Sequence, residues 1–135
     1  MVEKNLIATF KVEYPTVKKK KSNALITLNN YMKIHWATLN KIKKEFKDNI
    51  IEWYLSKNPK EQYDYLEIHS QVIRHNKRKL DADNAIFCVK WLADVLTDLN
   101  YVEDDCNNGY VLKPTIYSKD IETYIKFEIY GINNN

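Results

Sequence analysis

The residues best suited to chemistry in this chain are two groups of aspartates. Asp81 and Asp83 stand two positions apart in the run Asp-Ala-Asp-Asn, which we expect to follow a strand. In extended backbone, residues two positions apart project from the same side, so the two carboxylates should lie together. Two adjacent anions repel each other unless one is protonated or a cation binds both. The pair therefore predicts a site for a hard divalent cation such as Mg²⁺, which keeps water ligands for a substrate phosphate.

A second acidic group, Asp104 and Asp105, follows after one predicted helix. A helix of about 17 residues is roughly 25 Å long, so the second group meets the first only if the chain doubles back after Tyr101. The structural alternative is that Asp83 caps the helix and residues 104–109 form a solvated turn. The residues alone leave both interpretations open.

Several other kinds of site are excluded by residue type and spacing. A calcium-binding loop would need a glycine and a bidentate glutamate where Ile86 and Leu92 stand. The three histidines are scattered and neither cysteine belongs to a Cys-x-x-Cys pair, so the ligand spacing of a zinc site is absent. Two glycines in the whole chain leave no room for a phosphate-cradling loop. Cys88 and Cys106 are too few for a disulfide framework, and we expect both to be reduced.

The net charge of +3 is small, but the positive charges are unevenly distributed. Residues 103–105 are acidic, and a phosphate backbone would be repelled there unless a cation were bound. The same backbone would be attracted to three basic stretches, and contacts of this kind position DNA without reading its bases. These stretches are Lys18 to Lys21; Lys41, Lys43, Lys44 and Lys47; and Arg74, Lys77, Arg78 and Lys79.

Hydrophobic periodicity predicts two helices. Over residues 36–55, apolar side chains recur at three- and four-residue intervals without proline or glycine. A second helix is expected over about 83–100, with one apolar stripe and with Lys90 on the opposite face. Phe87 and Trp91 flank this lysine, which suggests either a contact between two copies of the chain or packing against another of its own elements.

Alternating apolar and polar residues predict strands over 5–14, 63–73, 110–117 and 122–130. We expect the region between Pro15 and the first helix to cross the surface as a loop, and the terminal asparagines to be frayed. These elements predict an α+β or mixed α/β fold, in which about four to five strands form one sheet covered by two helices. A chain of 135 residues has room for one core, so we expect a single domain, residues 1–135.

The composition is typical of a globular protein, with 44% hydrophobic and 29% charged residues. No apolar run approaches the roughly 20 residues that cross a bilayer. Glu3, Lys4 and Asn5 stand where a signal peptide would need its apolar stretch. We therefore expect a cytoplasmic protein with no membrane partner.

Residues 78–105, reading RKLDADNAIFCVKWLADVLTDLNYVEDD, resemble the signature of the RusA-type Holliday-junction resolvases. In that family a basic stretch leads into Asp-x-Asp-Asn, a helix with a lysine and Asp-x-Leu follows, and an acidic pair comes after a hydrophobic turn. Some members place the lysine where this chain has Phe87, and Lys90 matches through a three-residue insertion. An earlier piece, LITLNNYMKIHWATLNKIKKEF, is similar to the family's amino-terminal half. The residues that match the specific block are Asp81, Asp83, Asn84, Lys90, Asp94, Leu96, Asp104 and Asp105.

The resemblance implies a Mg²⁺-dependent homodimer, with Mn²⁺ as a substitute metal, that binds four-way DNA junctions and nicks two strands symmetrically in recombination and repair. Many family members are encoded by phages. A junction has two equivalent scissile phosphates, which a two-fold dimer with one metal site per subunit can match. The resemblance further implies that Asp81, Asp83 and Asp105, with Asp104 beside the last, bind the metal. Lys90 would then neutralise charge that develops on the phosphate.

Three other functions are compatible with the same residues. The first is a metal-dependent nuclease for flaps, nicks or other branched DNA. The second is a non-catalytic nucleic-acid-binding module, in which the aspartates only cap a helix and form a turn. The third is a hydrolase of nucleotides or small phosphoesters, although such substrates would not need the basic stretches.

Overall fold

A computed structural model of the chain describes residues 2–19, 22–74, 85–102, 109–119 and 122–134. Its fold is α+β, as predicted, with one mixed five-stranded sheet and a separate two-stranded sheet. The elements in chain order are β1 (Val2–Glu13), β2 (Thr16–Lys19), β3 (Ser22–Leu25), α1 (Leu28–Tyr31), α2 (Trp36–Trp53), β4 (Tyr65–Arg74), α3 (Ile86–Asp98), β5 (Tyr110–Leu112), β6 (Ile116–Lys119) and β7 (Tyr124–Asn134).

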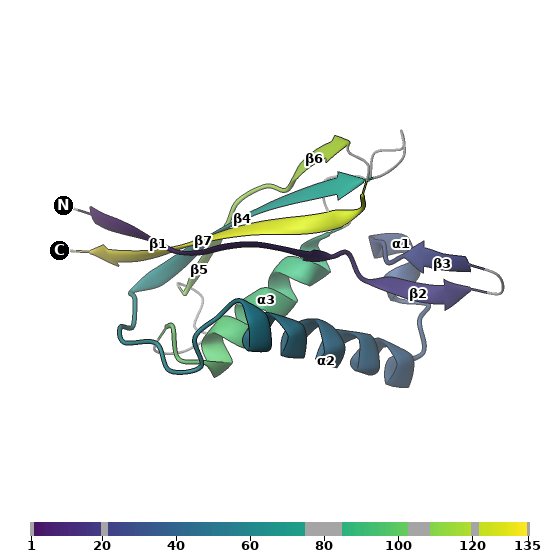
Figure 1. The fold of residues 1–135 in the computed structure, drawn as a ribbon, viewed down its shortest axis with the longest axis horizontal. Coiled ribbons are helices and arrows are strands. Elements are labelled where there is room, and N and C mark those ends of the chain that lie inside the picture. Colours follow the sequence, from purple (N-terminus) through teal and green to yellow (C-terminus); the bar gives the residue numbers. More distant parts are fainter. Residues whose placement is uncertain (1, 20–21, 75–84, 103–108, 120–121, 135) are drawn as a thin grey trace.

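The five-stranded sheet has β7 and β4 at its centre. β1 and β4 pair antiparallel with β7, one on each side, and β5 and β6 both pair parallel with the free edge of β4 (Figure 1). Buried and less buried residues alternate along most of β4 and β7, which produces one apolar face because neighbouring side chains of a strand point to opposite sides. Leu66, Ile68 and Val72 share that face, as predicted.

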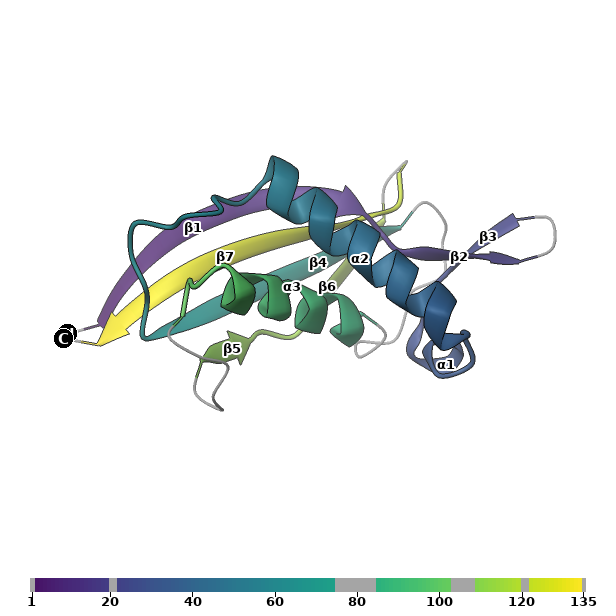
Figure 2. The same cartoon turned by 90° about the horizontal axis from the view of Figure 1, so that it is seen from below.

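Helices α2 and α3 lie side by side on this apolar face and cover it (Figure 2). Phe46 and Ile50 are the buried residues of α2 and lie on its inner side. Two ion pairs join the helices, Lys43 with Asp94 and Lys47 with Asp98. Since both pairs advance by four residues in each helix, α2 and α3 run in the same direction. Their N-terminal ends therefore lie at the same end of the molecule.

Phe87 and Trp91 are core residues of this chain, 6% and 3% exposed. The ring of Trp91 packs against Phe46 of α2, and Phe87 packs against Tyr31 of α1. Packing within the chain, one of the two alternatives considered for these residues, is therefore confirmed. A contact between copies through them is wrong, because other elements of the same chain bury both side chains and α3 is buried over more than one stripe of its surface.

Two segments are more regular than the sequence predicted. The region after Pro15 was expected to be a surface loop, but β2 and β3 form an antiparallel hairpin that projects beside the body (Figure 1). Its base is anchored where buried Tyr14 donates a hydrogen bond to the carbonyl of Ile26. The expectation of a frayed tail is wrong for Asn133 and Asn134, which complete β7 opposite β1, whereas Asn135 lies outside the described residues.

Candidate nucleic-acid interface

Residue Arg74 ends β4, and Ala85 immediately precedes α3. Between them, the predicted site residues Asp81, Asp83, Lys77, Arg78 and Lys79 lie outside the described residues. Arg74 and Ala85 are the described residues on either side of this connection, and we call them its anchors. It leaves the sheet at the C-terminal end of β4 and enters the helical layer at the N-terminal end of α3.

The second acidic group, Asp104 and Asp105, also lies outside the described residues. Its anchors are Val102, which forms a parallel bridge with Tyr63, and Gly109, whose carbonyl accepts a hydrogen bond from the backbone N–H of Leu66. Leu66 lies at the start of β4, and Tyr63 comes two residues before that strand begins. This connection is therefore anchored at the C-terminal end of α3, opposite the end where Ala85 lies (Figure 2).

Asn100 is the residue that turns the chain at this end. It has a φ of 66°, a left-handed conformation that asparagine tolerates better than most residues. The turn lets the N–H of Tyr101 donate to the carbonyl of Leu96 and ends α3. Val102 then lies beside Tyr63. Up to Val102 the chain therefore runs toward the start of β4, and the doubling back that a shared metal site requires falls on residues 103–108, outside the described residues.

The separation of the anchors sets a condition on a shared metal ion. A helix of 13 residues, the length of α3, is about 20 Å long. Asp83 is two residues from Ala85, and Asp105 is three from Val102, so the intervening backbone spans at most about 7 Å and 11 Å respectively. Carboxylates from both connections of one chain can bind one ion only if the connections extend toward each other along α3.

Lys90 lies on the exposed side of α3, as predicted, one helical turn before Asp94. Asp94, a residue of the matched block, forms an ion pair with Lys43 at 3.6 Å. Within the described parts of the chain, Lys90 has no such partner. Its ammonium group is therefore available to an anionic ligand, near the end of α3 that the Asp81 and Asp83 connection enters.

Arg74 occupies a partly buried position at the end of β4. Burial raises the pKa of the nearby Tyr14 phenol, the neighbouring Cys88 and Tyr117 add to that effect, and the positive charge of Arg74 opposes it. Arg74 therefore lies close enough to Tyr14, the residue after β1, for its charge to act on the phenol. Its charge acts on residues of the protein as well as on any ligand.

The lysines of α2 are less available than their number suggests. Lys43 and Lys47 pair with the aspartates of α3, and Lys44 pairs with Asp48 at 2.9 Å. Of the four lysines in this stretch, Lys41 alone forms no ion pair with a described residue. Three aspartates thus neutralise most of the charge that the sequence assigned to this helix.

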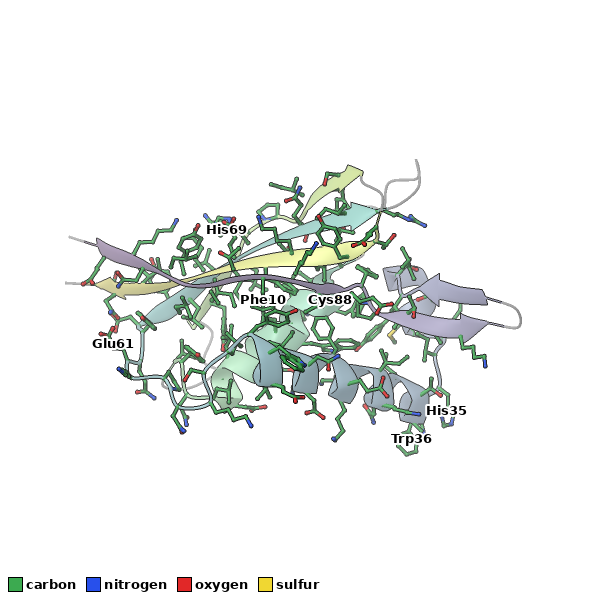
Figure 3. All side chains as sticks on the ribbon, viewed as in Figure 1. Phe10, His35, Trp36, Glu61, His69 and Cys88 are labelled. Carbon is green, nitrogen blue, oxygen red and sulfur yellow. The ribbon has the colours of Figure 1, made fainter. Side chains whose placement is uncertain are left out.

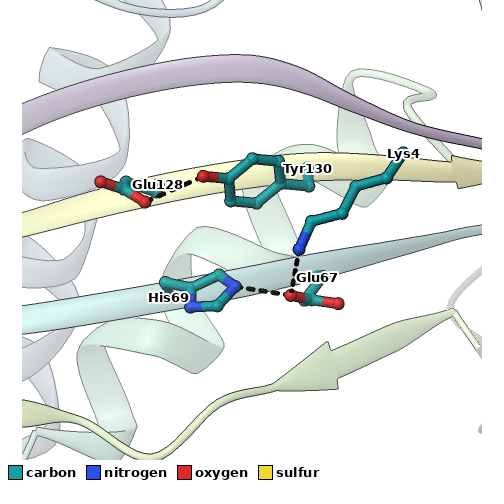
Figure 4. A network of polar contacts seen from close by, with 5 residues as sticks. All are labelled: Lys4, Glu67, His69, Glu128 and Tyr130. Atoms are coloured by element: carbon teal, nitrogen blue, oxygen red, sulfur yellow. Dashed lines mark hydrogen bonds and ion pairs between the residues drawn. The ribbon is translucent and has the colours of Figure 1, made fainter.

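The opposite face of the sheet carries a polar network that the sequence analysis did not identify (Figure 4). Glu67 Oε1 accepts hydrogen bonds from Lys4 Nζ at 3.1 Å and binds His69 Nε2 at 2.6 Å. Partial burial would raise the pKa of Glu67, but the hydrogen bonds from His69 and Lys4 outweigh it and hold that pKa below its usual value. The Tyr130 hydroxyl donates to Glu128, and this hydrogen bond is the largest cause of the raised pKa of Tyr130.

Neither this network nor any other cluster in the described ranges contains three histidine, cysteine or carboxylate side chains placed to hold a metal ion. Cys88 is fully buried, and burial raises the pKa of its thiol well above the usual value, so it is not a nucleophile. No helix in these ranges is long and apolar enough to span a membrane. The described residues therefore lie on both sides of the segments that contain the predicted metal ligands, but they do not include those ligands.

Comparison of the sequence with known proteins identified no related protein or family. No protein-family model matches the chain, and no match to a curated protein reaches significance.

Proposed function

We propose that this chain is a Mg²⁺-dependent endonuclease that resolves four-way DNA junctions by hydrolysing two symmetrically placed phosphodiester bonds, acting as a homodimer. The observation that carries the proposal is the charge at one end of the molecule. The N-terminal ends of α2 and α3, each a centre of positive partial charge, lie at the end where the Asp81 and Asp83 connection is anchored. Neither helix has an acidic residue in its first turn.

In this proposal Asp81, Asp83 and Asp105 hold the metal ion, with Asp104 as the neighbouring carboxylate. Their oxygen ligands suit Mg²⁺, and Mn²⁺ accepts the same donors. When bound, the ion would polarise the scissile phosphate and promote ionisation of an attacking water. The protein would supply the rest of the chemistry.

Two kinds of cation have separate roles. Lys90, with no ion pair to a described carboxylate, would neutralise the negative charge that develops on the phosphate during in-line attack. Arg74, Lys77, Arg78 and Lys79 would contact phosphates around the branch and fix the orientation of the DNA. Recognition by phosphate position suits a substrate defined by its shape.

The rival function is a non-catalytic nucleic-acid-binding module. It is favoured by the distance between the anchors of the two acidic groups, since aspartates that do not meet cannot share an ion. A nuclease for other branched DNA would use the same residues on a different substrate.

The deciding experiment compares wild type and Asp83→Asn on a four-way junction, a flap and a plain duplex, each with and without Mg²⁺. We expect wild type to cut the junction in a Mg²⁺-dependent way and to spare the duplex. Asp83→Asn should bind the junction with affinity close to that of wild type and lose at least about 100-fold in cleavage rate. Cleavage unaffected by Asp83→Asn would refute the metal site, and equal rates on junction and duplex would refute the substrate.

A further inference from the structure

An exposed pair of aromatic rings marks the N-terminal end of α2. Trp36, the first residue of the helix, is 71% exposed, and Met32 just before it is 84% exposed. The imidazole of His35 stacks on the Trp36 indole, with ring centroids 5.6 Å apart and planes inclined by 30°. Both rings project from the body of the molecule (Figure 3).

The orientation of His35 is fixed by the helix itself. Its Nδ1 accepts a hydrogen bond from the N–H of Ala37 at 3.2 Å and thereby caps α2. The imidazole therefore supports one face of the indole, and the exposed surface of the indole can receive another planar ring. Aromatic side chains presented in this way bind unpaired nucleobases by stacking.

Charge distinguishes this tryptophan from the other exposed tryptophan of the same helix. Trp36 lies at the positive end of α2, three residues after the exposed Lys33. The first acidic residue of α2 is Glu45, nine residues later and about 14 Å along the axis. The first acidic residue of α3 is Asp94, more than two turns into the helix. A polyanion would be attracted to this end.

Trp53, at the opposite end of α2, is exposed to the same extent, 71%. It lies at the helix terminus that carries negative partial charge, next to Glu52. The open groove that it lines also contains Glu13 and Glu122 against a single cation, Lys11, so its lining carries a net negative charge. A phosphate backbone would be repelled there, so Trp53 offers a similar ring without the charge complementarity.

We propose that Trp36, supported by His35, is a stacking platform for unpaired bases of nucleic acid, such as the bases exposed at a branch point. The inference rests on the proposed function only in taking nucleic acid as the partner, because stacking requires no cleavage. In this proposal the start of α2 recognises the faces of unpaired bases. The basic residues after β4 would recognise phosphates.

The test measures fluorescence anisotropy of labelled DNA in EDTA, so that binding is separated from cleavage. The probes are a mixed-sequence single strand, a four-way junction and a plain duplex. We expect Trp36→Ala to weaken binding of the single strand and the junction by about 5- to 100-fold and to change duplex binding less than 2-fold. The salt dependence should not change, since stacking releases no counterions.

Two variants control for the chemistry and for the fold. Trp36→Phe retains an aromatic ring and should recover most of the lost affinity. Trp53→Ala removes an equally exposed indole from the same helix and should bind every probe as wild type does. Both positions are exposed, so the variants should keep the wild-type denaturation midpoint.

The outcomes separate this proposal from the proposed function. Unchanged affinity in Trp36→Ala, or equal losses in Trp36→Ala and Trp53→Ala, would overturn the stacking platform. It would also be overturned if Trp36→Ala converted a DNA-free dimer into a monomer, because the rings would then form an interface between copies. Trp36-dependent binding without Mg²⁺-dependent cleavage would refute the nuclease alone, whereas a wild-type protein that bound none of the probes would refute both proposals.

Discussion

The ring of Tyr63 lies directly against the backbone of Gly131, in the space that the Cβ of any other residue would occupy at that position. Tyr63 also bridges Val102, and its N–H donates to the carbonyl of Tyr101. Tyr63 thus connects the central strand β7, through its ring, to Tyr101 and Val102, through its backbone. A close approach that only glycine permits therefore helps to anchor the segment that contains Asp104 and Asp105.

The first prediction concerns this contact. Gly131→Ala would place a methyl group inside the Tyr63 ring and force the ring or strand to move, at a cost of about 1–3 kcal/mol in the free energy of unfolding. The midpoint of urea denaturation should fall without a change in slope. In the Gly131→Ala/Tyr63→Ala double variant the total cost should be smaller than the sum of the two single costs. Strict additivity would show that the two residues do not interact.

The second prediction concerns Lys4 and Glu67, which pair across the intervening strand β7 and over the ring of Tyr130. The pKa of Glu67 is lower in the folded protein than its ordinary value of 4.5, so the carboxylate stabilises the fold above that pH. This contribution is lost as the pH falls through the folded-state pKa, because the carboxyl group is then protonated in both states.

Glu67→Gln should therefore lower the free energy of unfolding at pH 7 by about 0.5–1 kcal/mol, the upper range for partly exposed ion pairs. The difference from wild type should shrink as the pH is lowered from about 5 to 3, in denaturant titrations at each pH. A difference that stayed constant over this range would show that the charge of Glu67 is not its cause. Asp48→Asn, which removes the partner of Lys44 in an exposed pair, should cost less at pH 7.

The third prediction tests the role assigned to Lys90. Lys90→Ala should lower the rate of junction cleavage by about 100-fold and leave the affinity for the junction within about 3-fold of wild type, since the lysine acts on charge that appears during the reaction. Single-turnover cleavage and binding in EDTA measure the two quantities. Lys41→Ala is the matched control, an exposed helical lysine that forms no ion pair with a described residue, and it should cleave at the wild-type rate. Equal loss of binding and cleavage in Lys90→Ala would identify a DNA contact without a catalytic role.

The fourth prediction compares two sets of lysines. Lys43 and Lys47 are paired with aspartates, so replacing both with alanine should change the salt dependence of DNA binding by less than one unit of slope. Lys18 and Lys33 are exposed and form no ion pair within the described ranges. The corresponding double variant should reduce the slope by about one to two units. If the Lys43 and Lys47 variant had the larger effect, DNA would cross the outer side of α2.

Local patterns predicted the helices well. The absence of proline and glycine and the spacing of Leu39, Ile42, Phe46 and Ile50 placed α2 within two residues of its observed end. The strand β4 and the division of residues 110–119 around Pro114 followed in the same way. The hairpin of β2 and β3 was not predicted, because its short strands are mostly polar. The regular structure of Asn133 and Asn134 was not predicted either, because it depends on pairing with β1 and on a hydrogen bond to the side chain of Asp64.

For the candidate site, too, local properties could be predicted from the sequence and long-range contacts could not. Residue types and spacing alone determined that the chain has carboxylates suited to a hard cation, basic stretches and an exposed lysine on α3, because these properties belong to single side chains and to one helix or strand. The tertiary structure decided what lies next to what. It pairs Lys43 and Lys47 of α2 with aspartates of α3, brings the positive ends of two helices to the same end of the molecule as Trp36, and anchors the two acidic connections at opposite ends of α3. Pairing between residues distant in the chain depends on how strands and helices pack, and no local pattern encodes it.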